Sequence, residues 1–219
     1  MTAPTSPTPD NAPMFDRLAT RLIRPAVDAL AAPLARAGVG ANTVTWLGLG
    51  LGLGAAVFIA NGIFALGGLV IVLSRACDAL DGAIARQTQA TDLGGFLDIV
   101  LDFVFYASIP LAFAIENPTH NALAAAVLLA AFVGTGSSFL AFAVIAAKRN
   151  MDNVAYPNKS FYFLGGLTEG FETLVCFIAM CCWPAYFSEL ALGFSALCLV
   201  TLCSRIAWGM RAFSDPKAV

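Results

Sequence analysis

The chain has 219 residues, of which 59% are hydrophobic and only 12% are charged, and its formal net charge is -2 at pH 7. Soluble domains have roughly half apolar and a quarter charged residues, so a soluble fold would lack the polar surface to cover its core. The excess apolar surface indicates a membrane protein. The small net charge and the lack of a basic run exclude nucleic acid as an expected partner.

The N-terminal region divides into two parts. Residues 1–13 are rich in Pro, Thr and Ala and contain no basic residue, so we expect a disordered tail and no signal peptide. From residue 14 to 37 arginines alternate with apolar residues, and Arg17, Arg21 and Arg24 recur at helical spacing. This pattern predicts an amphipathic helix that lies on an anionic membrane surface.

Six apolar segments follow, each near the length of about 20 residues that crosses a bilayer core. Only helices or closed barrels satisfy the backbone in lipid, and these segments are too long and too uniformly apolar for barrel strands. We therefore predict an all-α integral membrane protein with six transmembrane helices after the interfacial helix. The expected spans are residues 44–59, 63–86, 92–115, 121–147, 161–187 and 190–208.

The basic residues predict how these helices are oriented. If the helices alternate in direction, all 12 Lys and Arg residues fall on one side, and the connections around residues 61–62, 116–120 and 188–189 contain none. The positive-inside rule then places both termini in the cytoplasm, together with the second-to-third and fourth-to-fifth connections.

Glycine, histidine and cysteine patterns indicate packing more than chemistry. Gly48 and Gly52, and likewise Gly50 and Gly54, form two interleaved GxxxG pairs, which predict close contacts between helices. His120 is the single histidine, and the six cysteines form no CxxC pair. A His-based triad or a zinc site is therefore not expected.

Four aspartates in the second and third spans are the most informative feature. Asp78 and Asp81 are three residues apart and share a helix face, and Asp98 and Asp102, four apart, share another. At a rise of about 1.5 Å per residue, a helical hairpin brings both pairs to similar depth near the cytoplasmic surface. The sequence thus predicts one acidic cluster.

Polar residues mark where the helices of this region begin. Residues 87–90 form a polar turn, and Thr91 can cap the third span. Asn42 and Thr45 are expected to supply capping groups at the start of the first span.

Four carboxylates at this depth need positive charge, because each costs a few kcal/mol to insert and they repel one another. An all-oxygen ligand set favours Mg²⁺ or Mn²⁺ over zinc. Gly82 and Ala85 leave the adjoining helix surface bare, and Arg86 offers a planar fork for phosphate.

Two other interpretations of the aspartates are ion pairing with nearby arginines and a role in transport. Ion pairing with Arg75 and Arg86 cannot balance four negative charges. A membrane transporter or ion pathway stays open as an alternative, although the acidic residues gather at one end of the bilayer and do not line a path through it.

The motif DxxDGxxAR…GxxxDxxxD resembles that of the class I CDP-alcohol phosphatidyltransferase family. The resemblance covers nearly the whole chain, since that family also has an N-terminal interfacial helix and six membrane helices. Residues 159–169 look like an uncharacterised bacterial inner-membrane branch. One departure is the turn between Arg86 and Gly94, which has seven residues where eight is usual. The matching residues are Asp78, Asp81, Gly82, Ala85, Arg86, Gly94, Asp98 and Asp102.

The resemblance implies an enzyme of phospholipid biosynthesis in a bacterial-type inner (cytoplasmic) membrane. Its domain would cover residues 14–212, with a short tail at 213–219. It would transfer a phosphatidyl group from CDP-diacylglycerol to the hydroxyl of a small polar alcohol and release CMP. Its site would face the cytoplasm, and we expect a homodimer surrounded by membrane lipids.

The resemblance also implies roles for individual residues. Asp78, Asp81 and Asp98 would hold one or two metal ions against the CDP diphosphate, and we expect two. Asp102 would help to bind metal and would act as general base on the acceptor hydroxyl. If the short turn moves Arg86 away from the diphosphate, Arg75 can replace it. The expected nucleotide-binding residues are Gly82, Ala85, Arg86, Asn42 and Thr45.

Two acceptor classes stay open. Cations on the cytoplasmic side suit an acceptor phosphate. Glu169 and Glu172 in the fifth span suit an amine or sugar hydroxyls. The candidate cations are Lys148, Arg149, Lys159 and Arg205.

Overall fold

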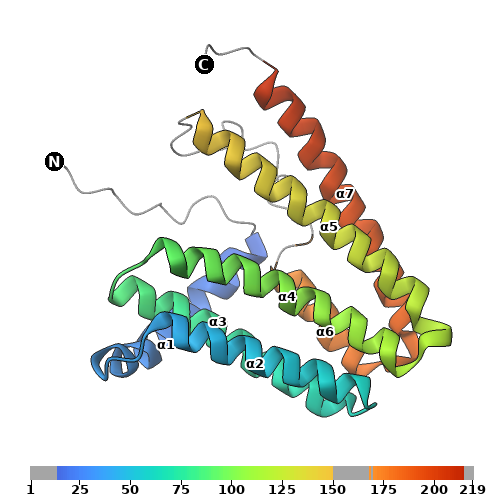
Figure 1. The fold of residues 1–219 in the computed structure, drawn as a ribbon, viewed down its shortest axis with the longest axis horizontal. Helices are drawn as coiled ribbons and strands as arrows, with labels where there is room; N and C mark the ends of the chain where they lie inside the picture. Colours follow the sequence, from blue (N-terminus) through green and yellow to red (C-terminus); the bar gives the residue numbers. More distant parts are fainter. Residues whose placement is uncertain (1–13, 150–167, 169, 215–219) are drawn as a thin grey trace.

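The computed structural model describes residues 14–149, 168 and 170–214, with side chains from residue 24 onward. Within these ranges the chain is helical and contains no strand (Figure 1). A 3-10 turn, η2 (Pro184–Tyr186), separates the last two helices. The helices are α1 (Met14–Arg36), α2 (Ala41–Ala60), α3 (Phe64–Gln87), α4 (Asp92–Glu116), α5 (Pro118–Lys148), α6 (Gly170–Cys182) and α7 (Phe187–Phe213).

Four described segments are long and apolar enough to cross a membrane: α2, α4, α5 and the continuous stretch of η2 and α7. Helix α3 is not among them, because two arginines and two aspartates interrupt its apolar sequence. The described part of α6 has only 13 residues. The all-α membrane architecture agrees with the sequence prediction, while the count of six spans stays a prediction.

The helix boundaries follow the expected spans closely from α2 to α5 and diverge at the fifth. A single helix was expected over residues 161–187, but α6 ends at Cys182 and α7 already begins at Phe187. Pro184 explains the break, since proline has no N–H to continue the helical hydrogen bonds. Residues 161–167, 169 and most of both predicted tails lie outside the described residues.

Capping agrees with the sequence prediction at one helix and not at another. The hydroxyl of Thr91 accepts a hydrogen bond from the Gly94 N–H at 3.0 Å and caps α4 as predicted. The prediction that Asn42 and Thr45 cap the first span is wrong. Helix α2 begins earlier, at Ala41, and its N-cap is a glycine without a side-chain hydrogen bond. The Thr45 hydroxyl instead donates to the Ala41 carbonyl at 3.1 Å.

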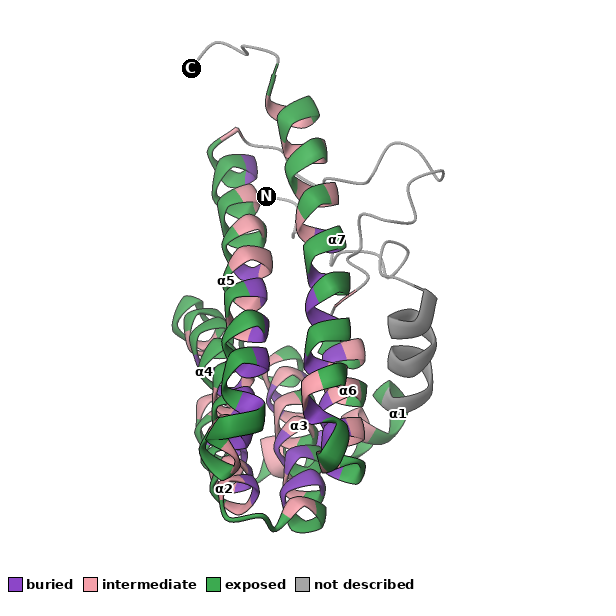
Figure 2. Cartoon of the chain, turned by 90° about the vertical axis from the view of Figure 1, so that its right-hand side faces the viewer, coloured by how far each residue is buried: buried purple, intermediate pink, exposed green. Residues whose placement is uncertain are grey.

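The helices form two groups. Helix α2 packs against α3 and α4, α3 also contacts α1 and α6, and α5 packs against α7 and α4. Figure 1 shows α2, α3, α4 and α6 running nearly parallel, with α5 and α7 leaving this layer at an angle. In Figure 2 the far ends of α5 and α7 extend beyond the other helices and are mostly exposed. The core holds stacked rings such as Phe113 and Phe187, whose centroids lie 4.5 Å apart.

Only one of the two GxxxG pairs on α2 packs against a neighbouring helix. A Cβ atom at Gly52 would lie 2.5 Å from the ring of Phe105 on α4, and Gly48 approaches α3 similarly closely. At Gly50 and Gly54 an added Cβ atom would meet nothing within 4 Å. The prediction of close packing therefore holds for Gly48 and Gly52, and this contact draws α3 and α4 together around α2.

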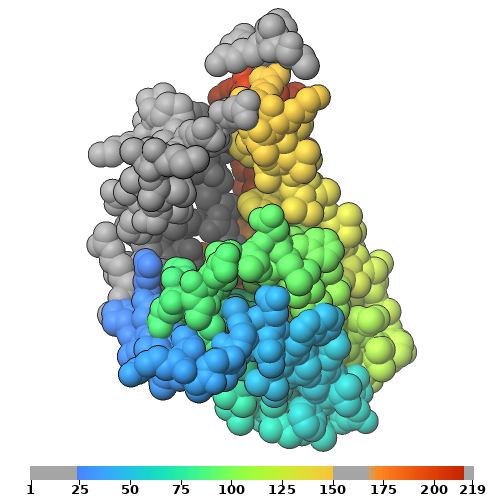
Figure 3. Space-filling view, turned by 60° about the vertical axis from the view of Figure 1, so that its left-hand side comes forward, coloured from blue at the N-terminus to red at the C-terminus, as the bar shows by residue number. Residues whose placement is uncertain are grey.

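Helix α1 lies against the end of α3. Its Ala31 is fully buried in a small cluster with Ala83 and Ile84 of α3. The Gln87 side-chain amide donates to the Asp28 carbonyl at 3.0 Å. Figure 3 shows α1 beside the turn that joins α3 to α4. A helix is thus present where one was expected, while its position on a membrane surface stays a prediction.

Candidate active site

Three aspartates converge between α3 and α4. Ligand oxygens of Asp78, Asp98 and Asp102 all lie within 4.8 Å of one another. Asp78 comes from α3 and the other two from α4, so the cluster depends on the close packing of both helices against α2. The convergence that the helical hairpin predicts is present for these three.

Asp81 lies apart from this group. It is 6% exposed, and its Oδ2 atom has no hydrogen-bond partner among the described residues. A buried carboxylate oxygen without a donor is costly, and a bound cation would satisfy it. The orphaned oxygen and the all-carboxylate donor set together fit a hard divalent metal such as Mg²⁺ or Mn²⁺.

Arg75 of α3 contacts two members of the cluster. Its Nη1 atom donates to Oδ1 of Asp102 at 2.6 Å and lies 3.5 Å from Oδ1 of Asp78. Its guanidinium carbon stands 4.0 Å from the centroid of the Phe105 ring. Ion pairing between an arginine of α3 and the aspartates is therefore present, but Arg75 contacts only two of the four aspartates.

The second arginine of α3 pairs with a residue of α1. Arg86 pairs with Asp28 of α1, with Nη2 and Oδ1 3.3 Å apart, and its side chain is 50% exposed. A Cβ atom added at Gly82 would meet only Arg86 Nη1, at 3.4 Å. Ala85 is partly exposed as well. The helix surface at Gly82 and Ala85 is therefore open, as the sequence predicts.

Two polar residues at the start of α2 lie near the same region. Thr45 lines a small cavity together with Arg75 and the three converging aspartates. A Cβ atom added at Gly94 would lie 3.2 Å from Asn42 Oδ1, so Asn42 adjoins the start of α4. Both residues are therefore beside the α3–α4 hairpin.

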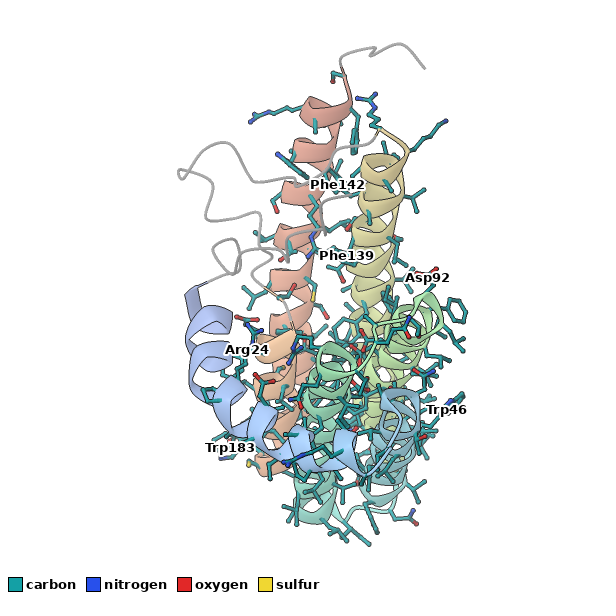
Figure 4. All side chains as sticks on the ribbon, turned by 90° about the vertical axis from the view of Figure 1, so that its left-hand side faces the viewer. Arg24, Trp46, Asp92, Phe139, Phe142 and Trp183 are labelled. Atoms are coloured by element: carbon teal, nitrogen blue, oxygen red, sulfur yellow. The ribbon has the colours of Figure 1, made fainter. Side chains whose placement is uncertain are left out.

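A pocket of about 480 Å³ adjoins the cluster on the side of Asp98 and Asp102. It lies between α4, α5, α6 and α7, and one wall is aromatic (Tyr106, Phe132 and Phe139). Figure 4 shows Phe139 and Phe142 on α5, with α7 alongside. Its polar lining includes Thr135, Thr168, Thr173 and Arg205.

The three threonines and Tyr106 were not identified from the sequence. They belong to different apolar helices or to the segment before α6, and they share no motif or spacing. Isolated hydroxyls in apolar helices usually bond to their own helix, as Thr135 does with the Ala131 carbonyl at 3.1 Å. Only the packing of the helices brings these groups to one pocket.

Of the residues expected to bind the acceptor, Arg205 lies in this pocket. Its Nη1 atom donates to the Thr135 carbonyl at 3.0 Å, and its guanidinium lies 5.8 Å from the Phe139 ring centroid. Glu172 is partly buried on α6, next to the lining residue Thr173. Lys159 and Glu169 lie outside the described residues.

The cations at the end of α5 have a different position. Arg149 donates to the carbonyl of Phe213 at 3.1 Å and stacks on its ring, with 5.3 Å between the guanidinium and the ring centroid. Arg149 thus joins the ends of α5 and α7, and neither it nor Lys148 lines the pocket.

Comparison with known proteins identifies the family. The model of the CDP-alcohol phosphatidyltransferase domain matches residues 39–202. The chain belongs to the CDP-alcohol phosphatidyltransferase family. The predicted resemblance and the predicted class of enzyme are therefore confirmed, and the whole aspartate motif lies within the matched region.

Three relatives show how far the similarity extends. The inner membrane protein YnjF of Escherichia coli is 47% identical over 193 residues, which cover 88% of this chain and 94% of YnjF. A phosphatidylinositol phosphate synthase of Streptomyces avermitilis is 41% identical over 44% of this chain and 38% of its own length. An archaetidylinositol phosphate synthase of Pyrococcus horikoshii is 35% identical over 47% of this chain and 54% of its own length. The inner-membrane relative and the apolar helices together indicate a multi-pass membrane protein.

A solved structure shares the fold. The crystal structure of Mycobacterium tuberculosis phosphatidylinositol phosphate synthase (PgsA1) with CDP-DAG bound superposes with a TM-score of 0.67. The match covers 88% of this chain and 98% of that chain at 19% sequence identity, a level that supports the fold alone.

Proposed function

We propose that the protein transfers a phosphatidyl group from CDP-diacylglycerol to the hydroxyl of a small polar alcohol and releases CMP, as a step of phospholipid biosynthesis. The observation that carries this proposal is the convergence of Asp78, Asp98 and Asp102 within 4.8 Å. The cluster adjoins both an open helix surface at Gly82 and a pocket of about 480 Å³, which suits two substrates. Family membership supports the same reaction.

Two Mg²⁺ or Mn²⁺ ions are the cofactors we propose. Asp78, Asp81, Asp98 and Asp102 would hold them, and the donor set and the orphaned Asp81 oxygen support this assignment. When bound, the metal would neutralise negative charge on the diphosphate of the donor lipid.

In the proposed reaction, the acceptor oxygen forms a bond to the phosphorus that carries the diacylglycerol. The bond from that phosphorus to the CMP oxygen breaks, and CMP leaves with the electron pair. Asp102 takes the proton of the acceptor hydroxyl as general base. Its position supports this role, because Asp102 belongs to the acidic cluster and also lines the larger pocket.

The nucleotide of the donor lipid would bind on the opposite side of the cluster from the pocket. The bare surface at Gly82 and Ala85 allows close approach, and the half-exposed Arg86 offers its fork to a phosphate oxygen. Asn42 and Thr45 at the start of α2 would complete this subsite. A solved relative has CDP-DAG bound, which is consistent with such a donor.

The acceptor would occupy the larger pocket. Its three threonine hydroxyls and Arg205 suit a phosphorylated polyol. The names of two partial relatives, a phosphatidylinositol phosphate synthase and an archaetidylinositol phosphate synthase, point to the same class. Lys159 would add a second cation. Glu169 and Glu172 would instead favour an amino alcohol.

The membrane arrangement we infer is one domain over residues 14–212 in the inner membrane, with both termini and the active site on the cytoplasmic side. The distribution of basic residues supports it. The protein would act as a homodimer. Reporter fusions at the two termini, together with mass determination in detergent, test these statements.

Purified protein supplied with CDP-diacylglycerol and a panel of alcohols tests the function through release of CMP. We expect release only with a divalent cation and a matching acceptor. If no alcohol supports CMP release, and vesicles containing the protein carry an ion flux that aspartate variants abolish, the transporter alternative replaces this proposal.

A further inference from the structure

Arg75 connects the two helices that carry the acidic cluster. One guanidinium nitrogen, Nη1, lies 2.6 Å from Asp102 Oδ1 on α4 and 3.5 Å from Asp78 Oδ1 on α3. The Arg75 side chain is only 13% exposed, so water screens these interactions poorly. Both contacted aspartates are among the three whose ligand oxygens converge.

The guanidinium is also held from the side away from the carboxylates. The ring of Phe105 lies 4.0 Å below it, and Nη2 donates to the Ser74 hydroxyl at 3.4 Å. Ser74 in turn donates to the Gly48 carbonyl of α2 at 2.7 Å. Arginine stacks well on aromatic faces while its edge donates hydrogen bonds. The packing therefore keeps this cation inside the cluster.

The other arginine of α3 provides a contrast. Arg86 is half exposed and pairs with a surface aspartate, so it can exchange that partner for a phosphate at low cost. Arg75 is itself largely buried and cannot leave without abandoning two partly buried carboxylates, which is unfavourable. Arg75 is therefore poorly placed to replace Arg86 as a ligand of the diphosphate, the alternative that the sequence allows.

We propose that Arg75 is a positioning residue that sets the metal affinity of the aspartate cluster. Its guanidinium joins Asp78 of α3 to Asp102 of α4. It contacts the carboxylate oxygens that a divalent cation would also bind. This holds the carboxylates in place and also competes with the cation for them. The proposal rests on the proposed function, because it assumes that the cluster binds metal.

The proposal predicts opposite effects of removing Arg75 on stability without metal and on affinity for a divalent cation. Removing the positive charge leaves the carboxylates repelling one another, so the protein becomes less stable without metal. The same change removes the competitor, so a divalent cation binds more tightly and restores the lost stability. A purely structural arginine would lower stability equally with and without metal.

The test compares Arg75→Gln, Arg75→Lys and the wild-type protein in detergent. Mn²⁺ binding is followed by the electron paramagnetic resonance of free Mn²⁺, and Tm is measured with Mn²⁺ and with chelator. Arg211→Gln is the matched control, since Arg211 is exposed in the last turn of α7. Neither readout requires substrate.

We expect Arg75→Gln to lower the Kd for Mn²⁺ about tenfold, the scale of one charge-assisted contact. Its Tm in chelator should fall by several degrees and recover with Mn²⁺. Arg75→Lys, which keeps the charge, should stay within about threefold of the wild-type Kd, and the control should match wild type. If Arg75→Gln is too unstable to purify in chelator, we expect it to fold when Mn²⁺ is present throughout.

Three results would overturn the proposal. They are an unchanged or higher Kd in Arg75→Gln, an equal loss of Tm with and without Mn²⁺, and failure of the variant to fold in Mn²⁺. An unchanged Kd with a raised KM for CDP-diacylglycerol would assign Arg75 to phosphate binding. If wild-type protein itself bound no Mn²⁺, the proposed metal-dependent function would fail as well. Normal Mn²⁺ binding and CMP release in wild type would confine the failure to Arg75.

Discussion

Two regions contribute to the candidate site in different ways: the layer of α2, α3 and α4, and the pocket region between α4, α5, α6 and α7. In the first region, glycine contacts on α2 bring two helices together, and the aspartates occur at regular helical intervals. In the second, separate hydroxyls and one arginine line a pocket without any common spacing. Under the proposed function, the first region would hold a diphosphate and its metal, and the second would recognise an acceptor. We therefore expect substitutions in the first region to stop the reaction, and substitutions in the second to change only acceptor binding.

The largest expected effect is that of Asp102→Asn. The substitution keeps the shape of the side chain but removes the base, so CMP release should fall by a factor of roughly 10² to 10⁴ or more. The fold and most of the binding of a CDP-lipid analogue should remain, because Asp78, Asp81 and Asp98 keep their charges. Normal turnover combined with loss of an ion flux would favour the transporter alternative. It would also show that Asp102 is not the general base.

Removal of metal should have a comparable effect. With excess chelator we expect no CMP release, because four carboxylates alone repel a diphosphate. Mg²⁺ or Mn²⁺ should restore activity, while zinc alone should not, since the cluster offers neither His nor Cys. Full release of CMP in excess chelator would contradict the metal assignment.

The same division explains how much the sequence could predict. The α3–α4 hairpin and its aspartates were predictable because their geometry depends on local intervals of three and four residues. Thr91 as a cap is equally local. Pairing of Arg86 with Asp28 was not predictable, because it joins residues that are 58 positions apart. The pocket proposed for the acceptor was not predictable for the same reason, since its threonines lie on or next to helices whose relative placement only the fold determines.

Steric exclusion of the nucleotide is expected from Gly82→Leu. The added side chain would cover the open surface of α3 and block the CDP-lipid, while all four aspartates remain. Titration of a CDP-lipid analogue should detect little or no binding. Gly50→Leu is the matched control, because Gly50 is an open position too, with nothing within 4 Å of an added Cβ atom, but it lies on α2. Equal affinity in both variants would show that the nucleotide binds elsewhere.

A smaller effect is expected from Arg86→Lys. Lysine keeps the charge but loses the planar fork, so affinity for the CDP-lipid analogue should fall about ten- to a hundredfold, or about 1.5–3 kcal/mol. Turnover at saturating substrate should change much less. Asp28→Asn is the control, because it removes the ion pair between Arg86 and α1 but leaves the guanidinium of Arg86 intact. It therefore distinguishes the effect of losing this ion pair from the effect of losing the phosphate contact. Unchanged affinity in Arg86→Lys would mean that the shorter turn before Gly94 has moved this arginine away from the diphosphate.

The smallest effect, and the one that tests the second region alone, is expected from Arg205→Gln. This arginine is the cation among the described residues that line the acceptor pocket, and its other contacts are the Thr135 carbonyl and the Phe139 ring. Loss of its charge should raise the KM for a phosphorylated acceptor about tenfold, as one charge-assisted contact does, and leave the KM for CDP-diacylglycerol unchanged. Arg211→Gln, on the exposed end of the same helix, serves as the control. An amino alcohol should show no such dependence, because its recognition would rely on an acidic residue such as Glu172. A rise in the KM for CDP-diacylglycerol would instead mean that the lipid donor reaches into this pocket and that the two regions do not act separately.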